Sequence, residues 1–360
     1  MILADFSNLF DGDKNKYGNR DYKVSVPIHV YSFLLFYLPF LTVMKKIILG
    51  LFILAAAFIS APVFADEADS ASDSFDIRVL TFNIRLSTGE IGKPEEWKNR
   101  RPGAVELIKR GDYDFVGIQE AILHPTRKEL SQVDNLKADL PGYGMVFRSR
   151  DVSDKRGEGT PLMYNKSRWM LDESECGVFW LSLTPDKPGS KLLDADCPRT
   201  VCWGRFIRLE NGKPTDKAVY FYNTHLDHVG HKARLEGAMI LAEFIAKRKH
   251  NDPVFVTGDM NCTIDSPAMR YLAGERIVTT IAGKQYDVVS PIELKDVHAV
   301  LHPNTDEQTY HAWGKGNFNK RIDYIWASPC LKPVSSRVIT EKFNGLFLSD
   351  HHPVEATVKY

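Results

Sequence analysis

Several signals that identify common classes of protein are absent from this 360-residue chain. No glycine-rich loop of the GxxxxGK[ST] or GxGxxG type is present, which argues against a kinase or an NTPase. No Ser or Cys nucleophile elbow is present either, which favours direct attack by water. The cysteines show no zinc-finger spacing and no neighbouring His that completes one. The five cysteines are Cys176, Cys197, Cys202, Cys262 and Cys330.

An excess of charge of either sign is also missing. Lys and Arg number 46, as do Asp and Glu, and beyond residue 65 the chain holds 40 basic and 42 acidic residues, a net of −2. A general binder of duplex DNA carries a broad positive field. The charge balance therefore lowers the expectation of a nucleic-acid substrate without excluding it, because local patches differ from the total.

Apolar runs long enough to cross a membrane are missing as well. Ile28–Leu41 and Ile47–Ile59 are both shorter than the roughly 20 residues of a transmembrane helix. Met44-Lys45-Lys46 precedes the second run and Val63-Phe64-Ala65 follows it, which together indicate a secretory signal peptide over residues 44–65. A membrane anchor is the alternative.

This signal peptide implies an order of segments along the chain. We expect an upstream over-translation over residues 1–43, the signal peptide over 44–65, a disordered lead-in over 66–76 and a single domain over 77–360. Export places the protein in the periplasm or outside the cell, where disulfides form. A disulfide from Cys176 to either Cys197 or Cys202 is left open.

A short apolar strand, Val254–Thr257, ends in a glycine that is followed by Asp259 and Asn261. Two residues apart on an extended backbone, these two side chains point the same way. A carboxylate holds or activates water, and an amide donates hydrogen bonds to an oxyanion without adding negative charge. The alternative is a plain turn or an Asx cap.

Other strands end in side chains of the same chemistry. Asn83 lies near the end of the predicted strand Asp76–Ile84, Glu120 follows the strand Tyr113–Ile118, and His225 lies near the end of Lys217–Leu226. Active sites of α/β proteins lie at the carboxyl ends of strands. The alternatives are a structural amide for Asn83, a helix-terminal charge for Glu120 and a core histidine for His225.

The C-terminal part supplies the remaining polar groups. The strand Lys320–Ala327 carries Arg321 and Asp323 on the face opposite its large apolar residues, and Asp350 and His351 precede a final strand, Val354–Val358. Arg199 and Arg205 lie near Trp203, where an arginine can clamp a phosphate, although a surface salt bridge is the alternative. We take Arg199, Arg205 and Arg321 as candidate substrate-binding residues.

Three segments have the spacing of helices: Pro102–Arg110, Pro125–Leu140 and Gly230–Lys249. The last is expected to bury Leu235, Met239, Ala242 and Ala246. The basic cluster Lys98–Arg101 is expected to be a solvated helix start. The segment from Gln285 to Thr309 is expected to be rich in loops.

The strand-end residues together favour metal-assisted attack of water on a phosphate ester. Glu120 and Asp350 are hard oxygen ligands, which favour Mg²⁺ or Mn²⁺ over zinc. Asp323 is able to orient the imidazole of His351 and raise its basicity. Asn83, Asn261 and His225 offer donors for negative charge that develops on oxygen.

Six strings occur in an order and spacing that resemble the endonuclease/exonuclease/phosphatase superfamily, which contains pancreatic deoxyribonuclease. The strings are LTFNIR, GIQE, NTHLDH, VTGDMN, RIDYIW and SDHHP. The resemblance is greatest to secreted bacterial members and spans about residues 77 to 360. It implies a four-layer α/β/β/α sandwich, with two mixed sheets packed face to face and helices outside.

The resemblance also implies a role for each of eight residues. Glu120 would be the principal metal ligand, helped by Asn83 and Asp350, while Asp259 would orient the attacking water. Asn261 would hold a phosphate oxygen and His225 would donate to a non-bridging oxygen. Asp323 and His351 would form a dyad, whose histidine is described in the family as a base, an acid or an electrostatic stabiliser.

The implied function is that of a secreted, Mg²⁺-dependent phosphoesterase. Its substrate would be a nucleic acid or a phosphorylated small molecule or lipid, since one fold serves many substrates. We expect a monomer with no membrane span in the mature chain. The alternatives are a non-catalytic binding module on the same fold and a nuclease-type toxin subunit.

Overall fold

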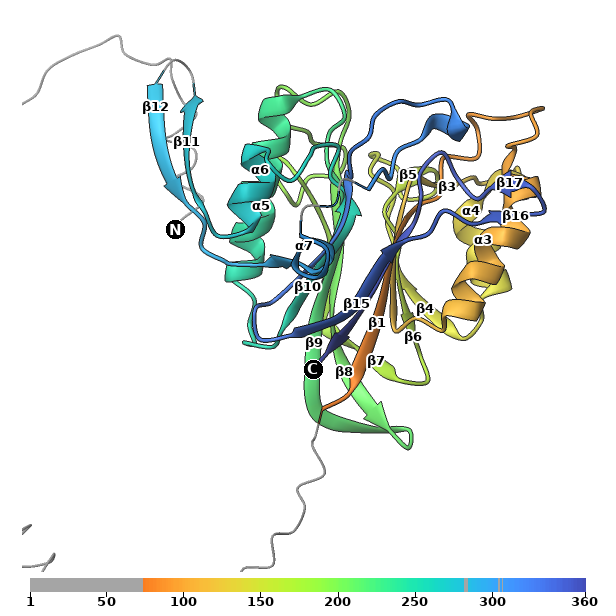
Figure 1. Ribbon diagram of the computed structural model, residues 1–360, viewed down its shortest axis with the longest axis horizontal. Helices are drawn as coiled ribbons and strands as arrows, with labels where there is room; N and C mark the ends of the chain where they lie inside the picture. Colours follow the sequence, from red (N-terminus) through yellow and green to blue (C-terminus); the bar gives the residue numbers. More distant parts are fainter. Residues whose placement is uncertain (1–73, 282–283, 304, 306) are drawn as a thin grey trace, which may run out of the picture. The chain divides into compact units, whose positions relative to one another are not determined.

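The computed structural model describes residues 74–281, 284–303, 305 and 307–360 (Figure 1). The expected over-translation and signal peptide, and residues 66–73 of the expected lead-in, lie outside the described residues. Asp76 already pairs with Lys359 in a sheet, and the ring of Phe75 stacks on Tyr360 at a centroid distance of 4.9 Å. The expectation of disorder up to residue 76 is therefore wrong at its end, because these contacts attach the segment to the last strand.

The first sheet has six strands in the order β15-β18-β1-β2-β6-β4. Its central strands β1 and β2 run parallel, and the other pairs are antiparallel. In chain order the strands are β1 (Asp76–Asn83), β2 (Phe115–Gln119), β4 (Tyr143–Val146), β6 (Leu162–Asn165), β15 (Lys332–Val338) and β18 (Val354–Lys359).

The second sheet also has six strands, in the order β13-β14-β10-β9-β8-β7. Here β9 and β10 form the parallel pair, again at the centre, and the other pairs are antiparallel. In chain order the strands are β7 (Trp169–Trp180), β8 (Thr200–Glu210), β9 (Lys213–His225), β10 (Val254–Asp259), β13 (Lys295–Asp296) and β14 (Asp323–Ala327).

The two sheets pack face to face and helices cover their outer faces, so the predicted four-layer sandwich is confirmed (Figure 1). Apolar residues of both sheets, among them Phe115 and Phe221, form the central core. The helices α3 (Trp97–Gly111) and α4 (Gln132–Asp139) cover the first sheet. The helices α5 (His231–Ala246) and α6 (Pro267–Leu272) cover the second.

Smaller elements connect these layers. In the described part of the chain they are the two-stranded sheet of β3 (Ala121–Leu123) and β5 (Gly157–Gly159), the hairpins β11 (Arg276–Ile281) with β12 (Lys284–Val289) and β16 (Lys342–Phe343) with β17 (Leu346–Phe347), the helix α7 (Val297–Leu301), and 3₁₀ turns at Lys128–Leu130 and Ala312–Gly314. The segment that we expected to be rich in loops, 285–309, contains most of β12 together with β13 and α7. Within the part of the chain that the structure describes, no helix has the length and apolarity that a membrane crossing requires.

Helix α3 begins at Trp97, five residues before the predicted start at Pro102. Pro102 lacks the N–H that would bond to the carbonyl oxygen of Lys98. The helix tolerates this loss near its start, where Lys98 is an exposed residue. The prediction of a solvated cluster at 98–101 is wrong for Arg100, which is 1% exposed. Its guanidinium donates to the carbonyl oxygens of Ile84 and Leu348 at 2.6 and 2.9 Å, which fastens α3 to two loops at one edge of the first sheet.

Helix α5 begins after a loop that Asp227 organises. Oδ1 of Asp227 accepts hydrogen bonds from the backbone N–H groups of Val229 and Gly230 at 3.0 and 2.8 Å. Of the predicted buried positions Ala246 is exposed, and Ile245 is buried in its place. The helix ends at Ala246, and in its last turn Ile245, not Ala246, packs in the core of the second sheet.

The five cysteines all lie within the described residues, and each is free. Neither Cys197 nor Cys202 is bonded to Cys176. Among the described residues, the fold is therefore held by its apolar cores rather than by disulfides.

We predict that Arg100→Met lowers the free energy of unfolding by about 2–4 kcal/mol, because it leaves buried carbonyl oxygens without a donor. The matched control is Arg110→Met on the same helix. Arg110 makes an exposed ion pair with Glu341, and its loss should cost less than about 1 kcal/mol. Urea denaturation of both variants measures the difference, and equal losses would contradict the anchoring role of Arg100.

Candidate functional site

The carboxyl ends of the two parallel strand pairs carry the predicted strand-end residues. Asn83 at the end of β1 lies opposite Gln119 of β2, and Glu120 follows directly. In the second sheet Asp259 of β10 lies opposite His225 of β9 on one side and Asp323 of β14 on the other. The register of three strands therefore puts His225, Asp259 and Asp323 in one row.

Asn83 joins the two sheets at this edge. Its Nδ2 donates to Oε1 of Glu120 and to Oδ2 of Asp259, both at 3.0 Å, and lies 3.5 Å from Nε2 of His351. Its Oδ1 accepts the backbone N–H of Arg85 at 3.0 Å. In this arrangement Asn83 acts as a donor between two carboxylates, and its oxygen is engaged by the backbone. That Asn83 helps to hold a metal ion stays a prediction.

Asp323 and His351 form the expected pair. Nδ1 of His351 lies 2.9 Å from Oδ2 of Asp323, and both residues are buried. Burial alone would lower the pKa of His351, but the negative charges of Asp323 and Asp259 raise it to about 10. Without a further cation His351 is therefore an imidazolium at neutral pH.

Asp259 lies between the two site histidines. Its Oδ2 is 3.6 Å from Nε2 of His351 and 3.4 Å from Nε2 of His225. Burial, together with the charge of Asp323, raises the pKa of Asp259 to about 7. A carboxyl group with this pKa takes up and releases a proton near neutral pH, as a general base requires.

His225 differs from His351 in its surroundings. Burial and the nearby positive charges of Arg199 and Arg150 put its pKa well below the usual value, so the ring is neutral. Nδ2 of Asn261 lies 2.9 Å from Nε2 of His225 and also donates to the carbonyl of Leu226 at 3.0 Å. Two histidines of one site are thus held in opposite charge states by their neighbours.

Glu120 and Asp350 form a second acidic group. Arg85 lies between them, with Nη1 3.8 Å from Oε2 of Glu120 and Nε 3.7 Å from Oδ2 of Asp350. Burial would raise the pKa of Glu120, but the hydrogen bond from Asn83 and the charge of His351 bring it below the usual value. Burial raises the pKa of Asp350.

This acidic group fits a hard divalent cation. Its donors are carboxylate oxygens, which Mg²⁺ and Mn²⁺ prefer. Both carboxylates already lie against a cation, the guanidinium of Arg85, so the surroundings are suited to positive charge. The cluster Asp259–Asp323–His351 also has ligand atoms within 4.8 Å of one another, but its histidine is engaged by Asp323.

Three residues at this edge have a left-handed backbone conformation. Arg85, Glu120 and Asn261 have φ values of 53°, 62° and 50°, in the left-handed region that non-glycine residues rarely adopt. Such conformations persist only where the surroundings impose them, and they cluster at functional sites. Here the strain turns the Glu120 and Asn261 side chains, both of which follow strand ends, toward the other residues of the site.

These residues line one cavity of about 310 Å³. Its lining includes six of the predicted catalytic and metal-binding residues: Glu120, His225, Asp259, Asn261, Asp350 and His351. Asn83 and Asp323 lie behind it, each in contact with a lining residue. The structure therefore brings together all eight strand-end residues that the sequence identified.

The cavity also contains residues that the sequence analysis did not select. Nη1 of Arg150 pairs with Oε1 of Glu158 at 2.6 Å, and both line the cavity. Burial raises the pKa of Glu158 to about 7. Tyr310 also lines it and forms an isolated bridge with His351. The strings that contain Arg150 and Glu158 look like polar loops in the sequence, so no local signal distinguishes them.

The three candidate substrate-binding arginines are separated. Arg199 lines the cavity, where its Nη2 contacts Nδ1 of His228 at 2.9 Å. Arg205 is not among the lining residues, because its strand position pairs it with Asp172 and Asp252. Arg321 pairs with Asp296 and stacks over Tyr324, also away from the cavity lining. The structure thus gives Arg205 and Arg321 structural contacts.

Comparison with known proteins finds a family model that matches most of the chain. The Endonuclease/Exonuclease/phosphatase family model matches residues 80–351. No curated protein matches the chain.

Several solved structures match over most of their length. An endonuclease/exonuclease/phosphatase from Bacteroides vulgatus is 28% identical with a TM-score of 0.66, over 79% of this chain and 98% of that one. A mannosyl-6-phosphatase from Bacteroides thetaiotaomicron is 27% identical with a TM-score of 0.64, over 78% and 99%. The catalytic domain of human Nocturnin, 18% identical with a TM-score of 0.57 over 79% and 96%, shares the fold.

We predict that Asp323→Asn lowers the pKa of His351 from about 10 by about 1–3 pH units, because it removes the nearest opposite charge. NMR titration of the imidazole nitrogens in metal-free protein measures the change. The control is Asp216→Asn at an exposed carboxylate. An unchanged midpoint in Asp323→Asn would contradict the electrostatic coupling of the pair.

The same coupling fixes a direction for stability. Because the folded-state pKa of His351 is raised, the stability from its charged ring is fully present below pH about 6.5 and is lost as the pH rises toward about 10. Urea denaturation of the metal-free protein across this range should show a decline that is smaller in Asp323→Asn.

Proposed function

Because the chain belongs to the endonuclease/exonuclease/phosphatase family, we propose that it is a Mg²⁺-dependent phosphoesterase that hydrolyses a phosphate monoester of a small molecule. The class of enzyme, a hydrolase of phosphate esters, follows from the family. The observation that supports the finer proposal is the single cavity of about 310 Å³ that holds acids, imidazoles and arginines together.

The size of the cavity favours a small substrate. Its volume is at the lower end of the range of small-molecule sites, about 300–1,000 Å³. A site for single-stranded nucleic acid combines a long positive groove with aromatic stacking platforms. Here Arg150 and Arg199 are each paired with a carboxylate, and among the described lining residues Tyr310 is the one Phe, Tyr or Trp. The similarity to a mannosyl-6-phosphatase supports a sugar phosphate.

The residues suggest how hydrolysis proceeds. Asp259, with a pKa near 7, orients water and accepts its proton, and Asn83 and His351 hold the carboxylate in place. Neutral His225 and the amide of Asn261 lie side by side in the cavity lining, and a bound phosphate that separates their 2.9 Å contact would accept hydrogen bonds from their N–H groups. His351, held as an imidazolium by Asp323, stabilises charge that develops on phosphorus-bound oxygens. The bond from phosphorus to the ester oxygen breaks, and that oxygen leaves as an alcohol after it takes up a proton, which balances the proton that Asp259 removes from water.

Glu120 and Asp350 are the residues that would hold Mg²⁺. When bound, the ion would polarise a phosphoryl oxygen as a Lewis acid and neutralise developing charge. Arg85, which contacts both carboxylates, would then be free to move toward the substrate. A non-catalytic binding module is not favoured, because all eight strand-end residues are present and Asp350 shares the Arg85 contact with Glu120.

Export through the predicted signal peptide is part of the same proposal, with the enzyme in the periplasm or outside the cell. The sequence pattern at residues 44–65 supports it. Intact mass spectrometry of the natural protein should show a chain that begins at Asp66. A mass that includes the residues before Met44 would contradict both the cleavage and the start at Met44.

We predict that EDTA abolishes hydrolysis of mannose 6-phosphate and that excess Mg²⁺ restores it. Glu120→Gln should lower kcat at least about 10²-fold, and His225→Ala about 10²–10⁴-fold, as expected for groups that act in the transition state. Glu129→Gln, at an exposed ion pair, is the control. Full activity in EDTA, or a preference for an oligonucleotide over all sugar phosphates, would overturn the proposal.

We predict that Arg150→Met lowers kcat/KM by about 10–100-fold. Arg150 lines the cavity, and a hydrogen bond from its guanidinium to the substrate phosphate would contribute about 1.5–3 kcal/mol. Arg205→Met is a matched control, because Arg205 also pairs with carboxylates but does not line the cavity. It should change kcat/KM less than about twofold. An equal loss in both variants would place the substrate elsewhere.

A further inference from the structure

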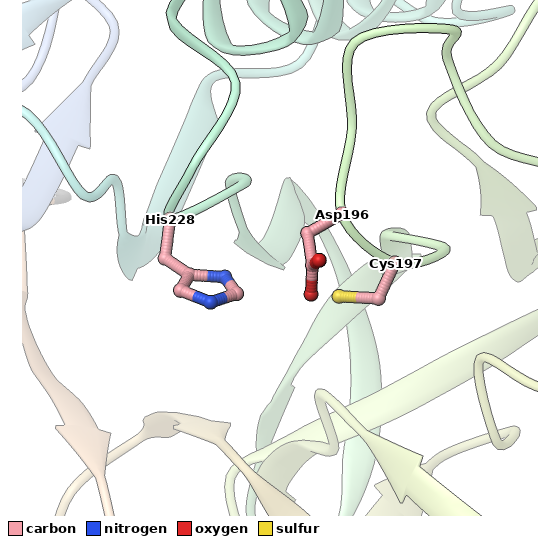
Figure 2. A group of neighbouring side chains, drawn as sticks. All are labelled: Asp196, Cys197 and His228. Carbon is pink, nitrogen blue, oxygen red and sulfur yellow. The ribbon is translucent and has the colours of Figure 1, made fainter.

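A second group of metal-binding side chains lies at the edge of the same cavity, apart from Glu120 and Asp350. It consists of Asp196, Cys197 and His228, and we call it the Cys–His group (Figure 2). The ligand atoms of the three residues lie within 4.8 Å of one another. All three residues line the cavity. The strand-end mechanism uses none of them.

The group is formed by two loops that are distant in the chain. Asp196 and Cys197 belong to the loop between β7 and β8, and His228 follows β9. Figure 2 shows the carboxylate and the thiol side by side, with the imidazole ring on the other side of the space between the loops. Asp227 holds the loops together, since its Oδ2 accepts the backbone N–H of Asp196 at 3.1 Å and lies 4.0 Å from Sγ of Cys197.

These donors differ in kind from those of the acidic group. A thiolate and an imidazole prefer Zn²⁺ and other borderline or soft transition metals, whereas carboxylates alone suit Mg²⁺. Tetrahedral Zn²⁺, with bonds of about 2.0–2.3 Å, places its ligand atoms roughly 3.3–3.8 Å apart. Asp196 and His228 are exposed and Cys197 is half-buried. Side-chain rotations that move each ligand atom by about an ångström would therefore close the group around an ion.

The charges around the group are balanced for a divalent ion. One carboxylate and one thiolate would neutralise M²⁺, so the ion adds no net charge beside Arg199. Arg199 contacts Nδ1 of His228 at 2.9 Å and Oδ2 of Asp227 at 3.4 Å. A guanidinium only donates, so Nδ1 of His228 presents its lone pair to Arg199. A metal ion bound to this nitrogen would take the place of that contact.

We propose that Asp196, Cys197 and His228 bind Zn²⁺ or a metal ion of the same class, at the entrance to the cavity and separately from the Mg²⁺ proposed at Glu120 and Asp350. Three protein ligands leave a fourth position of tetrahedral Zn²⁺ for water or an oxygen of a bound ligand. Because the group lines the cavity, a ligand bound in the cavity reaches this position. The inference does not depend on the proposed reaction.

The test uses the full chain with Co²⁺ as a spectroscopic substitute for Zn²⁺, in excess Mg²⁺ that saturates carboxylate sites. We expect one equivalent of Co²⁺ to produce a thiolate-to-metal charge-transfer band, and Zn²⁺ to remove it by displacement. Cys197→Ser should abolish the band. His228→Gln should weaken binding at least about tenfold, the lower limit for loss of a supporting contact.

Cys330→Ser is the matched control, since Cys330 is the exposed cysteine and does not line the cavity. It should leave the band unchanged. Absence of the band in the wild-type protein, its persistence in Cys197→Ser, or its loss in Cys330→Ser would each overturn the proposal. Circular dichroism checks that each variant is folded, and Asp196→Asn, at an exposed position, replaces any variant that is not.

Discussion

The amide of Asn83 is the contact on which the rest of the site depends. It donates to Glu120 of the first sheet and to Asp259 of the second, so it links groups from both halves of the sandwich. Two buried carboxylates that approach one another repel, and an uncharged donor between them relieves that repulsion without neutralising either. The amide therefore keeps the acidic, metal-binding part of the site next to the part that would activate water.

The architecture explains why these two parts meet. Each sheet has a parallel pair at its centre, β1 with β2 and β9 with β10, and the carboxyl ends of both pairs lie at the same edge. Antiparallel neighbours add residues from their starts, as β14 does with Asp323. Packing of the two sheets through Phe115 and Phe221 brings the two sets of strand ends together. Arg100 fastens the loop after β1 from the outside.

The same edge separates chemical roles through burial and charge. His351 is held as an imidazolium by Asp323, while His225 is neutral because it is buried beside arginines. Hard oxygen donors are gathered at Glu120 and Asp350, whereas the thiol and imidazole of Cys197 and His228 lie at the entrance. One cavity thus holds two sets of donor side chains, and the two proposed metal sites would differ in the ions that they prefer.

The sequence located the eight strand-end residues, because alternating apolar residues specify strands and polar residues directly after them reach the sheet edge. The fold class was implied by the resemblance of six sequence strings to a known superfamily. Only the tertiary structure decided that Arg150 and Glu158 line the cavity while Arg205 and Arg321 do not, since loop positions and side-chain pairing depend on contacts between distant segments. It also decided that Arg100 is buried. The spacing of 31 residues between Cys197 and His228 matches no metal motif, and the two approach because β8 and β9 pair in one sheet.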